Sequence, residues 1–162
     1  MLWSDARKAI KESSLTSSIY IGCDSQVRSV RRIINGEPKN VFVADYATVI
    51  ILHKDSRHGC KIFYHMETLP DYGVEGMIAR LWNEVEMSVK AYEAIKDVVN
   101  GRYLEIHVDT NTDECHASNR ITNSALGYVR GLGIIAVPKP DGFAATHAAD
   151  HCARRKSIFG AC

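Results

Sequence analysis

The pattern of hydrophobic and polar positions in the first half of the chain predicts three β-strands. Each segment is rich in β-branched and aromatic residues and ends in a polar cluster, as strands often do. An Asn35-Gly36 pair separates the first two segments and a polar stretch separates the last two, so the simplest arrangement is an antiparallel meander. We expect the first strand to stop at Asp24. The segments are SSIYIGCDS at 17–25, VFVADYATVIILH at 41–53 and CKIFYHME at 60–67.

The second half of the chain alternates helical and strand patterns. Apolar residues three or four apart from Val74 to Val98 predict a long amphipathic helix. The alternation in RYLEIHVDT predicts a strand that ends at Asp109. The other predicted elements are a short N-terminal helix at 2–13, a helix at 121–130, a strand GIIAVP at 133–138 and a final helix at 141–155.

This order of elements predicts an α/β fold. Three antiparallel strands followed by strands that alternate with helices give a mixed five-stranded sheet, antiparallel first and then parallel, with packed helices. The sequence contains no repeat or linker, so we expect a single domain over residues 1–162. Within it we expect a peripheral N-terminal helix in 1–16 and a C-terminal tail at 157–162.

Composition indicates the compartment of the protein. The five cysteines are odd in number and scattered, which is typical of free thiols in a reducing compartment. No apolar stretch approaches the roughly 20 residues that span a bilayer, and the N-terminus lacks the apolar core of a signal peptide. We therefore expect a cytoplasmic protein without a membrane partner.

The formal net charge of +1 gives no whole-molecule sign of nucleic-acid binding, so such binding has to come from local patches. One patch is the segment VRSVRRIINGEPKN at 27–40. Its four cations are Arg28, Arg31, Arg32 and Lys39. The pattern fits either a solvated edge or a set of phosphate contacts, and both interpretations stay open.

Three aspartates are the candidates for chemistry. Asp24 and Asp109 each close a predicted strand, and Asp150 projects from the final helix. If the two strands are adjacent and parallel, their carboxylates lie side by side. Such like charges raise one another's pKa and oppose folding unless hard cations such as Mg²⁺ or Mn²⁺ neutralise them. Two ions, one activating a water and one stabilising the leaving oxygen, would perform phosphoryl displacement as a nuclease does.

The element order, with Asp on the first strand, Glu on the long helix, Asp on the fourth strand and Asp on the last helix, resembles the ribonuclease H superfamily. The segment 149–154 looks like its final-helix pattern A-D-x-x-A-R. IGCDSQV, RLWNE, HVDTN, the Lys139-Pro140 pair and AATHAAD are similar to the ribonuclease H-like YkuK family of bacteria and phages, across 19–155. The resemblance implies a ribonuclease H-like fold and a nuclease that uses two Mg²⁺ or Mn²⁺ ions on RNA, DNA or RNA/DNA hybrid.

Carried over to this chain, the resemblance implies that Asp24 bridges both ions, flanked by Asp109 and Asp150. The helix glutamate has two candidates. Glu84 matches the RLxxE motif of the narrower family, whereas Glu75 lies nearer the helix start, where general ribonucleases H carry theirs. Nine residues apart at about 100° each, they point to opposite sides of the helix. Only one can serve, and we prefer Glu84.

Two further residues are candidates for handling a proton or a phosphate. His147 lies one turn before Asp150 and is either a proton carrier or a surface residue. Lys139 lies just before the last helix and either neutralises a phosphate or is an ordinary loop lysine. For His107 we favour a satisfied histidine of the sheet over a ligand. The chain departs from the well-studied ribonucleases H in having no histidine in the stretch before its last helix.

Other classes of function compete with the nuclease. A catalytically silent ribonuclease H-like module would bind nucleic acid through the same fold and the basic segment. The lack of a glycine-rich phosphate loop argues against the kinases of the superfamily. A zinc site is a weak alternative because the spacing of its ligands matches no standard pattern. Its candidate ligands are Cys115, His116, His147, His151 and Cys152.

Overall fold

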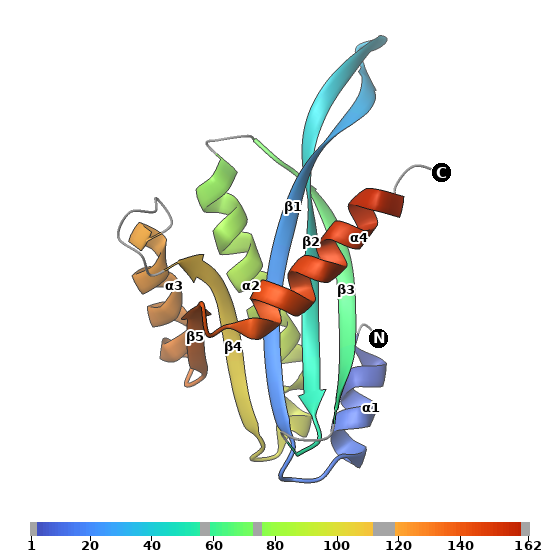
Figure 1. Cartoon of the computed structure of the whole chain (residues 1–162). Coiled ribbons are helices and arrows are strands. Elements are labelled where there is room, and N and C mark those ends of the chain that lie inside the picture. The colour runs from blue at the N-terminus through green and yellow to red at the C-terminus, as the bar shows by residue number, and fades with distance from the viewer. Residues whose placement is uncertain (1–2, 56–58, 73–75, 112–118, 160–162) are drawn as a thin grey trace.

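The computed structural model describes residues 3–55, 59–72, 76–111 and 119–159. Its strands are β1 Ser18–Ile34, β2 Glu37–His53, β3 Cys60–Pro70, β4 Tyr103–Asn111 and β5 Ile135–Lys139. They form one sheet in the order β3-β2-β1-β4-β5 (Figure 1). The first three strands pair antiparallel, β4 pairs parallel with β1, and β5 pairs parallel with β4. The predicted mixed five-stranded sheet is therefore confirmed.

Helices cover both faces of this sheet. They are α1 Ser4–Glu12, α2 Met77–Val99, α3 Asn119–Gly131, the π-helical segment η2 Ala144–Ala149 and α4 Asp150–Phe159. The first three lie against one face, and η2 with α4 cross the other (Figure 1). Successive strand residues point to opposite faces. Ile19 and Ile21 therefore join the large core with α2, and Tyr20 joins the smaller core with η2.

Packing fixes α2 against the sheet. Its buried residues recur at helical spacing, from Glu84 and Ser88 to Ile95 and Val98. Fully burying one large apolar side chain stabilises the fold by roughly 1.5–3 kcal/mol, so this face of α2 is strongly specified. The large core also includes Ile21, Ile50 and Ile106 of the sheet, Ile10 of α1 and Val129 of α3. The rotation of α2 that buries these residues also turns Glu84 inward.

The prediction that the first strand stops at Asp24 is wrong. β1 continues to Ile34 and pairs with β2 up to Ile34 and Glu37. Asn35 and Gly36 make the predicted turn, with φ values of 55° and 81°. A polar side chain does not end a strand whose backbone N–H and C=O groups still find partners, and β2 supplies those partners.

The helices, unlike the first strand, begin and end close to their predicted positions. α2 begins at Met77, and Val74, where we expected the long helix to start, lies outside the described residues. The final helix begins as η2 at Ala144 and continues as α4 to Phe159, so it includes the first residues of the expected tail at 157–162. Among the described residues, no helix has the length and apolar character needed to cross a membrane.

Candidate metal centre

Asp24 and Asp109 lie close together just beyond the point where β1 and β4 stop pairing. The parallel ladder between these strands ends at the pair Gly22 and His107. Continued by two residues, the same register sets Asp24 level with Asp109. The structure therefore brings together the two carboxylates that the sequence places on neighbouring parallel strands.

α2 adds a third carboxylate beside Asp24 and Asp109. Glu84 is only 6% exposed, and its Oε1 accepts a 2.6 Å hydrogen bond from Ser25 Oγ. Carboxylate oxygens of Asp24, Glu84 and Asp109 all lie within 4.8 Å of one another. Of the two glutamates considered from the sequence, Glu84 joins the aspartates, and Glu75 lies outside the described residues. We call these three residues the carboxylate cluster.

The carboxylate cluster lines a cavity of about 280 Å³. A water occupies about 30 Å³ of the liquid, so this space holds several groups of that size. The other lining residues are Ser25, Met77, Arg80, Leu81 and Lys139. Anionic and cationic side chains thus face one small space at the carboxyl end of β4.

Burial and crowding raise the pKa values of the cluster. The pKa of Asp24 rises to about 7, first because the group is desolvated and next because the charge of Asp109 lies close, with a shared hydrogen bond. Burial also raises the pKa of Glu84 well above its ordinary value, although the Ser25 hydroxyl opposes the shift. At neutral pH the cluster therefore retains protons or needs a cation.

Two cations of the chain lie at the same cavity. Lys139 Nζ forms an ion pair with Asp109 Oδ1. Arg80 Nη1 contacts Asp71 Oδ1 at 3.1 Å, and the positive charge of Arg80 acts against the rise in the pKa of Glu84. The sequence suggested Lys139 but not Arg80. The available signal for Arg80 was its position one helical turn before Glu84 in RLWNE.

Comparison with protein families identifies the chain. A family model described as Ribonuclease H-like matches residues 2–154. The chain belongs to the ribonuclease H-like family. Neither the curated proteins nor the solved structures gave a significant match. Family membership supports a nuclease or a nucleic-acid-binding module, and nucleases of this family use divalent metals.

The carboxylate cluster of this ribonuclease H-like chain fits a hard divalent cation. All three donors are carboxylate oxygens, the ligand type that Mg²⁺ and Mn²⁺ take. Asp109 Oδ1 accepts no well-directed hydrogen bond, although Lys139 Nζ lies in ion-pair contact with it. A cation would relieve the repulsion that raises the pKa of Asp24.

Asp150, the fourth predicted carboxylate of the ribonuclease H-like pattern, lies near the cluster but apart from it. Its Oδ1 accepts hydrogen bonds from Gln26 Nε2 at 3.2 Å and from Arg154 Nε at 2.6 Å. Its charge contributes to the raised pKa of Asp24, behind burial and Asp109. Among the described residues, the close group contains Asp24, Glu84 and Asp109 without Asp150. Metal ligation by Asp150 stays a prediction.

His147 is exposed and does not line the cavity. It belongs to η2, whose i→i+5 bonding changes the three-residue spacing that stacks side chains on an α-helix. A proton-carrying role for His147 stays a prediction. His107 is buried instead, with Nδ1 accepting the Ala144 N–H at 2.9 Å and Nε2 contacting Glu105 at 2.9 Å. It is a satisfied histidine of the sheet, as we favoured.

The basic segment of β1 and β2 divides into two parts. Arg28 forms an ion pair with Asp45, which is fully buried and also accepts a hydrogen bond from Thr68 Oγ1. Arg28 therefore neutralises a buried charge. The other three predicted nucleic-acid contacts lie further along the same hairpin and are exposed. They are Arg31, Arg32 and Lys39.

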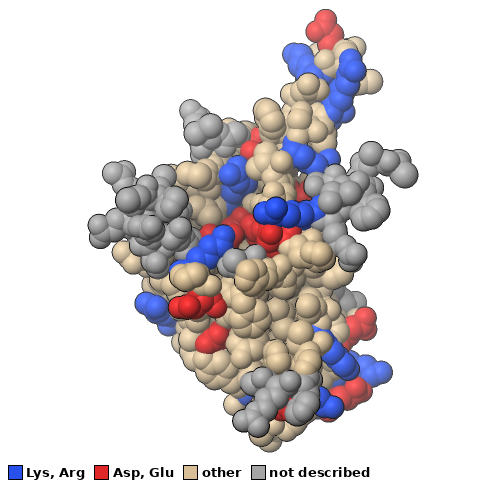
Figure 2. Space-filling view, viewed as in Figure 1, with Lys and Arg blue, Asp and Glu red and all other residues tan. Residues whose placement is uncertain are grey.

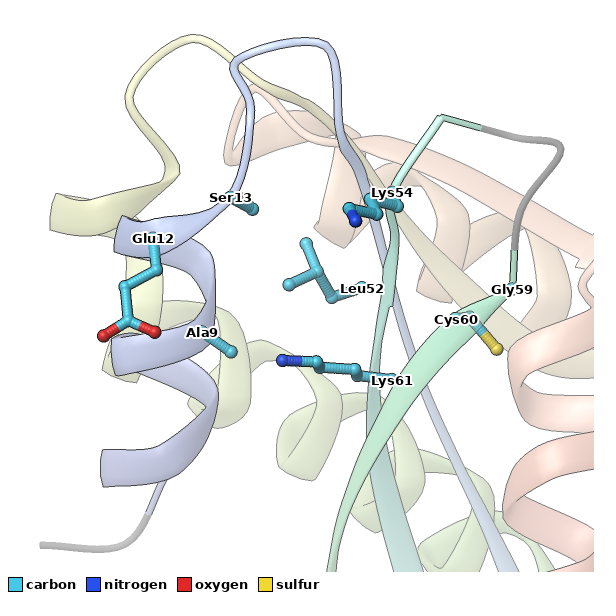
Figure 3. A pocket seen from close by; sticks show the side chains of 8 residues that line it. All are labelled: Ala9, Glu12, Ser13, Leu52, Lys54, Gly59, Cys60 and Lys61. Carbon is cyan, nitrogen blue, oxygen red and sulfur yellow. The ribbon is translucent and has the colours of Figure 1, made fainter.

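A larger cavity, of about 430 Å³, lies between α1 and the ends of β2 and β3 (Figure 3). Its polar lining includes Glu12, Ser13, Lys54 and Lys61. Among the described residues the close group of metal-ligating side chains lies at the smaller cavity, not here. Size alone therefore does not identify the functional site.

The zinc alternative finds no support in the part of the chain that the structure describes. Cys152 packs beside the apolar cluster that holds η2 against the sheet, and His147 and His151 are exposed. Cys115 and His116 lie outside the described residues. The groups that can be placed thus form no zinc-binding set.

Proposed function

We propose that this ribonuclease H-like protein is a divalent-metal-dependent nuclease that hydrolyses phosphodiester bonds of RNA, DNA or an RNA/DNA hybrid. The observation that carries the proposal is the convergence of Asp24, Glu84 and Asp109 from β1, α2 and β4. Three buried or half-buried carboxylates within 4.8 Å oppose the stability of the fold. A function that needs the charges explains their placement.

The three carboxylates would hold Mg²⁺ or Mn²⁺. The bound metal would act as a Lewis acid that favours a hydroxide nucleophile and stabilises the leaving oxygen. Ser25 fixes the orientation of Glu84 through its 2.6 Å hydrogen bond. Lys139 and Arg80 line the same cavity and would neutralise the non-bridging oxygens of a phosphate.

A second ion is part of the proposal and depends on Asp150. Its carboxylate stands close enough to raise the pKa of Asp24 but is held by Gln26 and Arg154. Ligation of a second ion would require Asp150 to leave Arg154, or to use its other oxygen. We also propose the narrower placement in the YkuK family, which rests on the sequence motifs alone.

A second candidate function is a nucleic-acid-binding module without chemistry. It is favoured by the ion pairs of Asp109 with Lys139 and of Asp150 with Arg154. In these pairs the chain's own cations already neutralise two carboxylates. A protein with such pairs can bind nucleic acid without a metal.

The test is cleavage by the wild type and by Asp24→Asn with Mg²⁺ or Mn²⁺, on labelled single-stranded and double-stranded RNA, DNA and hybrid substrates. Asp24→Asn keeps the shape of the side chain but removes its charge. We expect its rate to fall on the order of 10³-fold, about 4 kcal/mol of transition-state stabilisation.

Asp5→Asn is the matched control, because Asp5 is an exposed carboxylate of α1 that does not line the cavity. It should cut as the wild type does. Metal-independent cleavage, or equal rates for wild type and Asp24→Asn, would contradict the nuclease. Binding of nucleic acid with no turnover on any of these substrates would support the binding module.

A further inference from the structure

The β1–β2 hairpin extends well past the rest of the sheet. β3 pairs with β2 only as far as Val43, and β4 pairs with β1 only as far as Gly22. Within the strand ladders residues 29–42 therefore pair only with each other, and they project beyond every other element (Figure 1). At the base of this segment, Phe42 O also accepts a 3.0 Å hydrogen bond from the Asp71 N–H. We call residues 29–42 the hairpin arm.

The fold itself does not require the hairpin arm. Two strands without a third strand or a packed helix are marginally stable in water. The arm contributes nothing to the large core, and Ile33 and Phe42 are 79% and 53% exposed. Packing within the chain therefore does not account for the hairpin arm, which points to a contact with another molecule.

The charge of the hairpin arm points to an anion. Its charged residues are three cations and Glu37, so the arm carries a net charge of +2 in a chain of net charge +1. The Lys and Arg side chains lie along the arm, above the acidic side chains at the centre of the same view (Figure 2). The three cations are Arg31, Arg32 and Lys39.

Two of these cations face each other directly. Arg32 and Lys39 are register partners across the antiparallel ladder, so their side chains leave the same face. Like charges in directly opposite positions destabilise a hairpin. An anion bound between them would remove the repulsion, and a phosphate group is an anion that both side chains bind well.

The hairpin arm and the carboxylate cluster are connected by one strand. Every second residue of β1 lies on the same face of the ladder, so Arg32 shares the face of Asp24. Eight residues at about 3.3 Å each separate them by roughly 26 Å along β1. In double-stranded DNA each strand rises about 3.4 Å per nucleotide, so this separation equals about eight nucleotides of a duplex.

We propose that the hairpin arm binds the phosphate backbone of nucleic acid about eight nucleotides from the position held at the carboxylate cluster. The binding is independent of base sequence, because the contacts go to phosphates. The distance from the cut rests on the proposed nuclease, whereas the backbone contact itself does not. Long substrates would therefore bind more tightly than short ones.

The experiment is a binding titration with a chelator present, so that no strand is cut. Labelled single-stranded and double-stranded oligonucleotides of about five and about 20 nucleotides, each in two unrelated sequences, are titrated with wild type and R31A/R32A/K39A. We expect the variant to bind the long oligonucleotides on the order of tenfold more weakly at low salt. The slope of log Kd against log salt concentration should be smaller for the variant than for the wild type by about two to three. The short oligonucleotides should bind alike.

Three controls keep the result specific. K8A/K11A/K61A removes the same charge from exposed sites at the other end of the molecule and should bind as the wild type does. R31K/R32K keeps the charge and should retain most of the affinity. A thermal melt should show R31A/R32A/K39A folded, because its three side chains are exposed.

The outcomes separate this proposal from the nuclease. Equal binding of the long oligonucleotides by wild type and R31A/R32A/K39A, an equal loss for the short ones or an equal loss in K8A/K11A/K61A would overturn the role of the hairpin arm. Failure of the wild type to bind any oligonucleotide would do the same. Arm-dependent binding with chelator present, together with no cleavage of any substrate when Mg²⁺ or Mn²⁺ is supplied instead, would leave the hairpin arm supported and the nuclease contradicted.

Discussion

The carboxylate cluster and the hairpin arm both place like charges side by side, but in opposite surroundings. Asp24 and Glu84 are 8% and 6% exposed, so little water screens their repulsion, and the pKa of Asp24 rises to about 7. Arg32 and Lys39 are exposed, so water and salt weaken their repulsion. The buried set is costly to the fold unless it retains protons or binds a cation. The exposed pair costs little and suits a contact that forms and breaks.

The largest expected effect is stabilisation of the wild type by metal. A ligand that binds only the folded state at 100 times its Kd stabilises it by about 2.7 kcal/mol, which corresponds to roughly 5–10 °C in Tm for a domain of this size. A melt of the wild type at pH 8 with millimolar Mg²⁺ or Mn²⁺ should show this rise, and Asp24→Asn should not. A rise of equal size in both proteins would place the metal elsewhere.

The next effect is the pH dependence of the metal-free protein. The pKa of Asp24 is about 7 in the fold against an ordinary value of 3.8, so its proton is held more tightly in the folded state. Its contribution to stability is therefore complete below pH 3.8 and is lost as pH rises through about 7. We expect Asp24→Asn, which cannot ionise, to melt at least about 3 °C above the wild type at pH 8 without metal. This shift corresponds to a gain of about 1 kcal/mol in the free energy of unfolding.

The comparison at acidic pH is the control for this effect. Near pH 4 the Asp24 carboxyl is protonated in the folded wild type, so the advantage of Asp24→Asn should shrink or vanish. An advantage that is the same at both pH values would show that charge repulsion is not its cause. Metal stabilisation of the wild type should also grow between pH 5.5 and pH 8, since the ligands must lose their protons.

The smallest effect concerns the exposed cations. Arg32→Gln removes the like-charge pair with Lys39 but leaves both strands intact. We expect a rise in Tm below about 2 °C at low salt and no rise at about 1 M salt, where the Debye length is about 3 Å. A rise that persists at high salt would mean that propensity or packing, not charge, makes the difference.

Local signals in the sequence predicted most of the elements. The helical period of the long helix, the strand alternation before Asp109 and the Asn35-Gly36 turn each depend on neighbouring residues. The order of those elements then limited the sheet to an antiparallel start and a parallel continuation. The end of the first strand was misjudged because the polar signal near Asp24 is local, whereas its pairing with β2 is not.

The candidate site was predicted less completely. The strands that carry Asp24 and Asp109 could be matched from their positions. The choice of Glu84 over Glu75 followed from the family resemblance, and helix geometry added only that both cannot serve. Arg80 was missed although it lies one helical turn before Glu84, because that spacing alone does not distinguish it from other helix arginines. The partners of Arg28 and Asp150 were missed because the atoms that bind them lie on other strands and helices.

The sequence by itself determined the periodic elements, their order and the family motifs, since these depend on residues within a few positions of one another. Only the tertiary structure decided which charges are neutralised inside the protein and which remain for a ligand. Gln26 reaches Asp150 across 124 residues of chain, and Ser25 reaches Glu84 across 59. Such contacts depend on strand register and helix rotation, which are set by packing of the whole core.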